Sequence, residues 1–424
     1  MSTAPDPRSR RAAGPAAAAT GDPAASHPGA ARNLTLATLA SVVGFWGWTV
    51  IAPLGTRYAH DLGLNAAQTG ALVAMPVLVG AVGRVPVGVL TDKFGGRRLL
   101  TVILVLTAPL VLLIALAGSM KSYALLLVVG FFLGVAGTVF TAGIPFSAAW
   151  YPKSRQGFAT GIFGMGMGGT ALSAFLTPRL VTSIGYWQTH IIVAALLLIM
   201  AAVVFFFMRE SPTWTPVTSG SFGKLVNAAK MAVTWQLCFL YAVVFGGFVS
   251  FSTYLPTYLR DIYSFDLTSA GTRTAGFALA AVIARPIGGI IADRIGSKLV
   301  VVVALIGVSG LAFVVNSQPS GEVATGLTFL AMAASLGLGT GGVFAWVGKQ
   351  APPGTVGAVT GVVSAAGGLG GYFPPLVMGA TYNAQEHSYA IGLLLLAATA
   401  LVALVLALLM GRRRAQAAAG RAPA

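Results

Sequence analysis

The chain has 424 residues, of which 56% are hydrophobic and only 8% are charged, and its mean hydropathy is +0.83. Soluble globular proteins carry about 25% charged residues, so this composition excludes a soluble domain and indicates a membrane protein. The net charge of +16 could suggest a nucleic-acid partner, but the basic residues gather around the ends of apolar runs. That distribution is a signal of membrane topology, and we expect no nucleic-acid binding.

The chain begins and ends with segments of low complexity. Residues 1–33 are rich in Ala, Pro, Gly and Ser and contain Arg8, Arg10 and Arg11, but they lack the apolar core of a signal peptide. Residues 411–424 have a similar composition. Both segments are predicted to be disordered cytoplasmic tails.

Between these tails, the sequence predicts twelve membrane-spanning helices in two groups of six. The apolar runs long enough to cross a bilayer lie at 34–54, 67–90, 98–118, 122–150, 157–181, 187–207, 233–258, 269–292, 298–316, 321–348, 356–380 and 388–410. The longest polar interruption predicts a cytoplasmic linker at 209–232 between an N-terminal bundle (34–208) and a C-terminal bundle (233–410). The expected fold is therefore an all-α integral membrane protein built from two pseudo-symmetric six-helix bundles.

The basic residues predict the orientation of these spans. If both termini are cytoplasmic, the outer loops hold only five basic residues and two arginines lie within spans, so 19 of the 26 Lys and Arg residues are on the cytoplasmic side. This asymmetry follows the positive-inside rule. We expect a multi-pass protein of the bacterial cytoplasmic membrane, with the lipid bilayer as its surroundings.

An internal repeat supports the division into halves. RVPVGVLTDKFG begins at Arg84 and RPIGGIIADRIG begins at Arg285, 201 residues later, and GFATG at Gly157 recurs as GAVTG at Gly357. Transporters built from duplicated halves bind their substrates near the midplane, between the repeats.

Arg84 and Arg285 are the two basic residues deep within predicted spans, and the ten acidic residues lie at the ends of spans, in loops or in the tails. A central arginine costs at least about 2.5–3.5 kcal/mol, and arginine cannot lose its proton to avoid that cost. Each arginine could simply bond backbone carbonyls and brace its own bundle. The sharper hypothesis is that a substrate anion supplies the missing counterion, because paired guanidinium forks suit a small planar oxyanion.

Other residues are candidates for the same site or for a gate. Glycine-rich spans 5 and 11 place Gly166, Met167, Gly168, Gly367 and Gly368 at mid-depth, where glycines either line an anion pocket or only allow close helix packing. Tyr241 and Phe245 are one turn apart on span 7, which fits a pocket wall or ordinary packing. The turns after spans 2 and 8 carry candidate gate residues, which otherwise are only topology signals: Asp92, Arg97, Asp293 and Arg294.

GRVPVGVLTDKFGGRR closely resembles the span 2–3 signature of the major facilitator superfamily, and an arginine before its proline resembles the nitrate/nitrite porter branch. The resemblance extends through TAGFALAAVIARPIGGIIADRIG and both glycine-rich stretches, over nearly all of residues 34–410. It implies a twelve-helix carrier of nitrate or nitrite in which Arg84 and Arg285 bind the anion and Tyr241, Phe245 and Phe140 line it. Met167 departs from the asparagine that many family members carry.

The expected mechanism is alternating access, by exchange of nitrate for nitrite or by proton-linked nitrate uptake. Apart from the anion and protons, no cofactor, metal or protein partner is expected, and we expect a monomer. The sequence has a single cysteine, Cys238, and scattered histidines, so it predicts neither a disulfide nor a metal site. It shows no arrangement of catalytic residues, and we do not expect an enzyme. A carrier for another small anion such as cyanate, or a proton-coupled drug or metabolite transporter, would share the fold.

Overall fold

A computed structural model describes residues 26–152, 155–216, 221–351 and 355–410. Most of the predicted N-terminal tail and the whole C-terminal tail lie outside these residues. The N-terminal half contains α1 (Ala30–Trp48), η1 (Ala52–Leu54), α2 (Gly55–Leu62), α3 (Ala66–Val82), α4 (Arg84–Phe94), α5 (Gly96–Ser119), α6 (Tyr123–Leu133), η2 (Gly134–Thr138), α7 (Val139–Ala149), α8 (Gln156–Gly164), η4 (Met165–Gly168), α9 (Gly169–Ser183) and α10 (Tyr186–Phe207). The remaining helices are α11 (Ser221–Ala229), α12 (Ala232–Tyr263), α13 (Leu267–Ile295), α14 (Ser297–Asn316), α15 (Glu322–Gln350), α16 (Val356–Ala380) and α17 (Ala390–Leu409).

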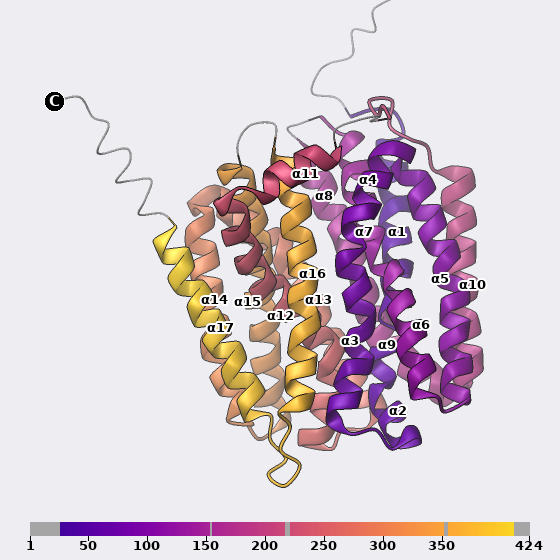
Figure 1. The fold of residues 1–424 in the computed structure, drawn as a ribbon, viewed down its shortest axis with the longest axis vertical. Coiled ribbons are helices and arrows are strands. Elements are labelled where there is room, and N and C mark those ends of the chain that lie inside the picture. The colour runs from indigo at the N-terminus through magenta and orange to yellow at the C-terminus, as the bar shows by residue number, and fades with distance from the viewer. Residues whose placement is uncertain (1–25, 153–154, 217–220, 352–354, 411–424) are drawn as a thin grey trace, which may run out of the picture.

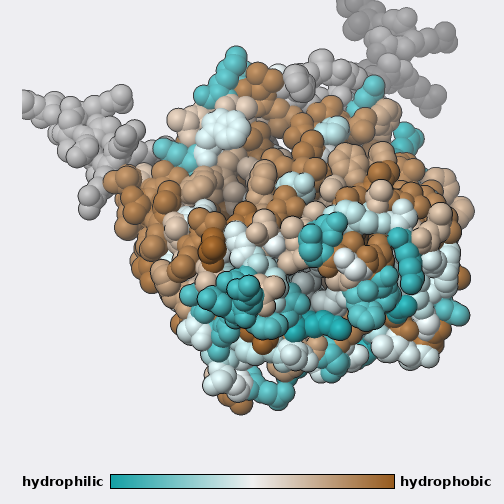
Figure 2. All heavy atoms as spheres, turned by 60° about the horizontal axis from the view of Figure 1, so that its bottom comes forward, coloured by the Kyte–Doolittle hydropathy of each residue, from teal (hydrophilic) through white to brown (hydrophobic). Residues whose placement is uncertain are grey.

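The helices form two bundles that stand side by side, α1–α10 in one and α12–α17 in the other (Figure 1). Helix α1 begins and α17 ends at the same end of the molecule, which we call the termini end, and α11 lies over it. The other end, called the opposite end, carries α2 and a concentration of hydrophilic residues, while the sides of the molecule are largely hydrophobic (Figure 2). This distribution is the one a bilayer imposes on a multi-pass protein.

The described residues contain ten segments long and apolar enough to cross a membrane, or eleven if the bent pair α3–α4 is counted as one span. Helix α16 is not among them, but its 25 residues extend about 37 Å and it packs against both α12 and α3. With α16 as a span, the arrangement matches the predicted twelve.

Several helices extend beyond their predicted ends. Helix α1 begins at Ala30 rather than 34, and α12 continues to Tyr263 rather than 258. One consequence is a correction for Asp261, which was expected in a loop. It falls in the last turn of α12, where it accepts a hydrogen bond from the hydroxyl of Tyr389. That carboxylate lies at the opposite end of the molecule, so it does not neutralise an arginine at mid-depth.

The helix that carries Arg84 is broken, and its counterpart is not. Helices α3 and α4 meet at Gly83 with a bend of 42°. Pro86 lies in the first turn of α4 and cannot donate a hydrogen bond to the carbonyl four residues earlier, which weakens the helix beside the flexible Gly83. Pro286 has the same chemistry in α13, yet α13 runs unbroken from Leu267 to Ile295.

The two halves pack closely at the opposite end. A side chain at Gly70 or Gly379 of one half would collide with the backbone of the other, and Arg179 of α9 donates to the hydroxyl of Thr272 of α13 at 2.7 Å. At the termini end, by contrast, Gly157 and Gly161 of α8 have no atom within 4 Å of the position of a side chain. The halves are therefore closed against each other at the opposite end and separated along α8 at the termini end.

Candidate functional site

Arg84 is the first residue of α4, and only 2% of its surface is exposed. Its Nε donates to the carbonyl of Gly80 at 3.1 Å. One terminal nitrogen donates to both the carbonyl and the hydroxyl of Ser364, at 2.7 and 2.9 Å. Ser364 is on α16, so this buried side chain of the N-terminal half is tied to the C-terminal half.

Arg285 makes the reciprocal contact from the other half. It is half-buried on α13, and a terminal nitrogen lies 3.0 Å from the sulfur of Met167, which is on η4 of the N-terminal half. Each arginine thus reaches the glycine-rich span of the opposite half, as the internal repeat would produce. A thioether is only a weak acceptor, so the charge of Arg285 is poorly satisfied by this contact.

Two phenylalanine rings lie beside both guanidinium groups. Phe140 of α7 and Phe245 of α12 have their ring centroids 5.0–5.9 Å from the central carbon of each arginine. Phe344 of α15 lies 5.3 Å from Arg285. Aromatic faces attract cations, so the three rings offset part of the positive charge without supplying a counterion.

Neither arginine forms an ion pair with a carboxylate in the part of the chain that the structure describes. The predicted pairing of two unneutralised arginines is therefore present, since the structure brings both onto the same two rings. Two adjacent positive charges in a largely apolar environment attract an anion.

Tyr241 adds a polar group to this site. Its ring stacks on Phe245 with centroids 4.9 Å apart and packs edge-on against Phe344 at 4.7 Å. The residue is fully buried, and its hydroxyl has no hydrogen-bond partner among the described residues. A buried hydroxyl without a partner is costly, so it is a natural donor for a bound ligand.

The predicted glycines divide into two groups. A side chain at Gly367 would collide with the rings of Tyr241 and Phe245, and one at Gly368 would collide with Ala81 and lie 3.6 Å from the Arg84 guanidinium. These two glycines let α16 approach the site closely. Gly166 instead packs against Ser41 of α1, and Gly168 faces open space, so neither contacts the arginines.

A small cavity of about 10 Å³ lies beside Arg285, lined by residues that include Met167, Phe245 and Thr340. That volume is about the size of one water molecule. A polyatomic anion in this cavity would have to displace neighbouring side chains such as Met167.

Two of the four predicted gate residues, Asp293 and Arg97, make contacts within their own halves. Asp293 of α13 lies 3.6 Å from the ammonium of Lys349 on α15, and Arg294 is exposed. Arg97 donates to the carbonyl of Met208 at 3.3 Å, and Asp92 is half-buried on α4. The gating role stays a prediction.

Glu210 was not predicted, although it holds the turn before α5. Its carboxylate accepts a hydrogen bond from the backbone nitrogen of Arg97 at 2.7 Å, at the N-terminus of the helix. Burial raises the pKa of this carboxyl, while the hydrogen bonds from Arg97 and Gly96 act in the opposite direction. Sequence reasoning classed it with the loop acids because nothing in its neighbours reveals a partner more than 100 residues away.

Sequence reasoning also missed Ser364 and Phe344. Phe344 is on the counterpart of the span that carries Phe140, so the internal repeat could have identified it. Ser364 could not be found in this way, because its role depends on the depth at which α16 crosses Arg84. No cluster of three metal-ligating side chains occurs within the described residues.

Comparisons with known proteins agree on one family. The profile of the Major Facilitator Superfamily matches residues 37–375 and 267–423. The probable nitrate/nitrite transporter NarK2 of Mycobacterium tuberculosis (strain ATCC 25618 / H37Rv) is 54% identical over 375 residues, which are 88% of this chain and 95% of that protein. The nitrite extrusion protein of Bacillus subtilis (strain 168) is 33% identical over 89% of this chain and 94% of its own length.

Two further comparisons concern another sequence relative and a solved structure. The probable nitrate/nitrite antiporter NarK1 of Thermus thermophilus is 31% identical over 82% of this chain and 85% of its own length. Among solved structures, a bacterial homolog of the human lysosomal transporter Spinster, in an inward-facing and occupied conformation, superposes with a TM-score of 0.67. It covers 92% of this chain and 98% of its own, at 18% sequence identity, which is a similarity of fold.

Proposed function

The chain belongs to the major facilitator superfamily, and we propose that it carries nitrate, nitrite or both across the bacterial cytoplasmic membrane by alternating access. It is a multi-pass transporter rather than an enzyme. The names of its relatives support the choice of anion. The observation that carries the proposal is the pair Arg84 and Arg285, two buried or half-buried cations that contact the same two rings and have no carboxylate partner within the described residues.

The chemistry around the arginines fits a small planar oxyanion. Each guanidinium presents a planar fork of donors that can bind two oxygens of nitrate or nitrite at once. Tyr241 offers a third donor, and Phe140 and Phe245 provide flat walls against which a planar anion can stack. We propose these five residues as the binding site, with Gly367 and Gly368 allowing α16 to close on it.

Reciprocal contacts suggest how binding is coupled to movement. In this structure Arg84 is bonded to Ser364 and Arg285 contacts Met167, so both arginines are tied to the opposite half. An anion that takes over these donors releases those contacts and offsets the repulsion between the two cations. The released halves can then rock about the site, and the anion stabilises the state in which both arginines close upon it.

The orientation of the carrier remains a proposal from the positive-inside rule. If the termini end is cytoplasmic, closure at the opposite end makes this structure an inward-facing state. The candidate gate residues Asp92 and Asp293 would then lie at the cytoplasmic ends of α4 and α13, on the side that is open here.

Exchange of nitrate for nitrite is the mode that the site favours. A proton symporter needs a titratable group in the pathway, and in the described part of the chain the two arginines are bordered by aromatic rings, a serine and a methionine. His190 is buried in the first turn of α10, where its Nδ1 is 2.7 Å from the carbonyl of Tyr186, in the half that holds Arg84 but near the opposite end. Proton-linked uptake is the alternative.

A transport assay in proteoliposomes tests the proposal. Purified protein is reconstituted into vesicles loaded with nitrite, nitrate or chloride, and the entry of isotopically labelled nitrate is followed with and without a protonophore. We expect rapid entry into vesicles loaded with nitrite or nitrate, unaffected by the protonophore, and little entry into chloride-loaded vesicles.

The other outcomes identify the alternatives. Uptake that requires an inward proton gradient and does not depend on internal nitrite would show that the mode is symport and not exchange. Competition by cyanate stronger than that by nitrite would reassign the anion. Absence of nitrate movement under every gradient, in protein that remains folded, would refute the proposed function.

A further inference from the structure

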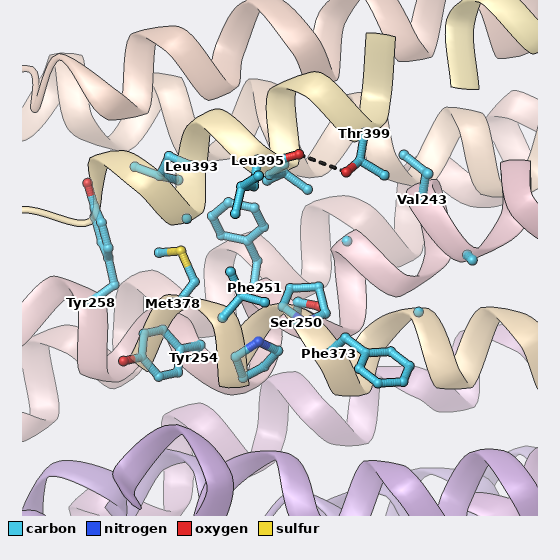
Figure 3. Close-up of a pocket in the computed structure, with 18 of the residues that line it drawn as sticks. Val243, Ser250, Phe251, Tyr254, Tyr258, Phe373, Met378, Leu393, Leu395 and Thr399 are labelled. Carbon is cyan, nitrogen blue, oxygen red and sulfur yellow. Dashed lines mark hydrogen bonds between the residues drawn. The ribbon is translucent and has the colours of Figure 1, made fainter. Parts of the chain in front are cut away.

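A second, larger cavity lies in the C-terminal half, away from the arginines. It has a volume of about 430 Å³ and is formed by α12, α16 and α17 (Figure 3). Volumes of this size are typical of sites for organic ligands. Figure 3 shows Val243 and Thr399 toward one end of it, and Tyr258 and Leu393 toward the other.

The cavity is long in the direction of the helices. Its lining on α12 runs from Phe239 to Tyr258, a distance of about 28 Å along a helix that rises 1.5 Å per residue. The hydrocarbon layer of a bilayer is about 30 Å thick. The lining on α16 runs from Gly370 to Met378 and that on α17 from Gly392 to Thr399, about 12 and 10 Å, so the three helices together enclose only part of a groove that is longer along α12. This elongated shape suits a segment of an extended chain.

Polar atoms in the groove are already satisfied. The hydroxyls of Tyr254 and Tyr258 are bonded to Tyr389 and to the carbonyl of Val315, at 3.1 and 3.2 Å. The hydroxyl of Thr399 donates within its own helix at 2.7 Å. No polar side chain in the lining therefore lacks a partner, and an occupant with polar groups would lose its own hydration without compensation.

Ser250 is the remaining polar side chain of the lining, and its hydroxyl is used structurally. It lies 2.7 Å from the carbonyl of Gly246 and 3.3 Å from that of Gly371 on α16. Pro375 has no N–H with which to satisfy the Gly371 carbonyl, so the serine takes that role. The polar side chains of the groove thus serve helix packing, and the surface that remains for an occupant is apolar.

The groove is continuous with the surface that faces the bilayer. Phe373 on α16 and Leu395 on α17 line it and are 58% and 50% exposed, and the neighbouring Leu394 and Leu401 of α17 are exposed as well. In a multi-pass membrane protein, such residues contact lipid tails. The medium that reaches the groove is therefore hydrocarbon.

We propose that this groove binds one acyl chain of a membrane phospholipid. The chain lies between α12, α16 and α17, on the far side of α12 from the anion site, because Tyr241 and Phe245 are on the other face of that helix. The lipid site needs neither nitrate nor a particular transport mode, so its failure would leave the proposed function intact.

Photolabelling of the full-length protein tests the proposal. The protein is placed in lipid nanodiscs that contain a phosphatidylglycerol with a diazirine in one acyl chain, irradiated, and digested for mapping of labelled residues by mass spectrometry. We expect labels on groove residues of α12, α16 and α17 to exceed, by about fivefold, labels on Ile199, an exposed residue of α10 that only bulk lipid touches.

Two filling variants and a matched control make the test specific. Leu396→Trp and Thr399→Phe each place a larger side chain in the groove, and both should reduce groove labelling at least about fivefold. Leu394→Trp adds the same bulk on the same helix outside the lining and should leave the labelling unchanged. Should Leu396→Trp fail to fold by size-exclusion chromatography, Thr399→Phe decides. Labelling equal to that of Ile199, or labelling that persists in a folded filling variant, would overturn the proposal.

Discussion

Arg84 and Arg285 hold equivalent positions in the two halves, yet their surroundings differ in polarity. Arg84 is almost completely buried and donates to two carbonyls and a hydroxyl. Arg285 is half-buried and donates to the sulfur of Met167, a weak acceptor. The same residue type at the same depth is therefore well satisfied in one half and poorly satisfied in the other.

This difference teaches that a pseudo-symmetric pair need not share one role equally. Hydrogen bonds to a charged group contribute about 1.5–3 kcal/mol, so the contacts of Arg84 stabilise the empty carrier as well as preparing the site. Arg285 has little to lose when an anion arrives. We infer that Arg285 provides most of the affinity for the anion, whereas Arg84 connects anion binding to the position of α16.

The largest effect is expected from Arg285→Lys. Lysine keeps the charge but loses the planar fork, so nitrate exchange in proteoliposomes should fall by about tenfold to a hundredfold, the loss of one or two charge-assisted hydrogen bonds. Thermal stability should change little, because the arginine has a weak acceptor here. Arg84→Lys should lower both the exchange rate and the melting temperature.

A control variant tests whether the two arginines have different roles. Arg98→Lys changes an exposed arginine on α5 and should leave exchange and stability as they are. If Arg285→Lys transports normally, or if it destabilises the protein more than Arg84→Lys does, the division of roles between the two arginines is wrong.

Tyr241→Phe should separate binding from stability in the same site. Removing the hydroxyl costs the anion one donor, and we expect its apparent affinity to fall about fivefold, near 1 kcal/mol. The same change removes a buried hydroxyl that has no partner within the described residues, so the melting temperature should stay equal or rise. A fall in stability with unchanged affinity would show that the tyrosine only packs.

The arrangement of the helices was largely predictable from the sequence, because apolar runs and the internal repeat depend on local composition. The pairing of Tyr241 with Phe245 followed from helical spacing, and the shared environment of the two arginines followed from the repeat. Helix ends were less predictable: α12 continues past Pro256 because nothing in the next turn disfavours a helix, and it thereby includes Asp261. The contacts that cross between halves depend on the relative depth of two distant helices, which no single segment encodes.

The substitution Ser364→Ala tests the role proposed for Arg84, and its expected effect on nitrate binding is smaller. The variant removes one of the acceptors that compete with the anion for Arg84, while the backbone carbonyl of residue 364 remains. The empty carrier is therefore destabilised relative to the bound one, and nitrate should bind about threefold more tightly. Ser364→Thr keeps the hydroxyl and should behave as the natural protein. Weaker binding in Ser364→Ala would mean that the hydroxyl contacts the anion itself.

The contrast between halves extends to the turns at the termini end. In the N-terminal half, Glu210 is mostly buried against the start of α5 and bonds the backbone nitrogen of Arg97. In the C-terminal half, Asp293 is 72% exposed and pairs with Lys349 in water. Exposed ion pairs contribute little to stability, so the two acids should respond differently to substitution.

The smallest expected effect is the pH dependence of Glu210→Gln. Burial raises the pKa of Glu210 in the folded protein, so the folded state holds this proton more tightly than the unfolded state does. The contribution of Glu210 to stability is then greatest below its ordinary pKa of about 4.3 and declines as the pH rises through the raised value. The melting temperature of the glutamine variant, relative to that of the natural protein, should therefore increase across this interval by about one to three degrees. A melting-temperature difference that does not change with pH would contradict the effect of burial on this carboxyl.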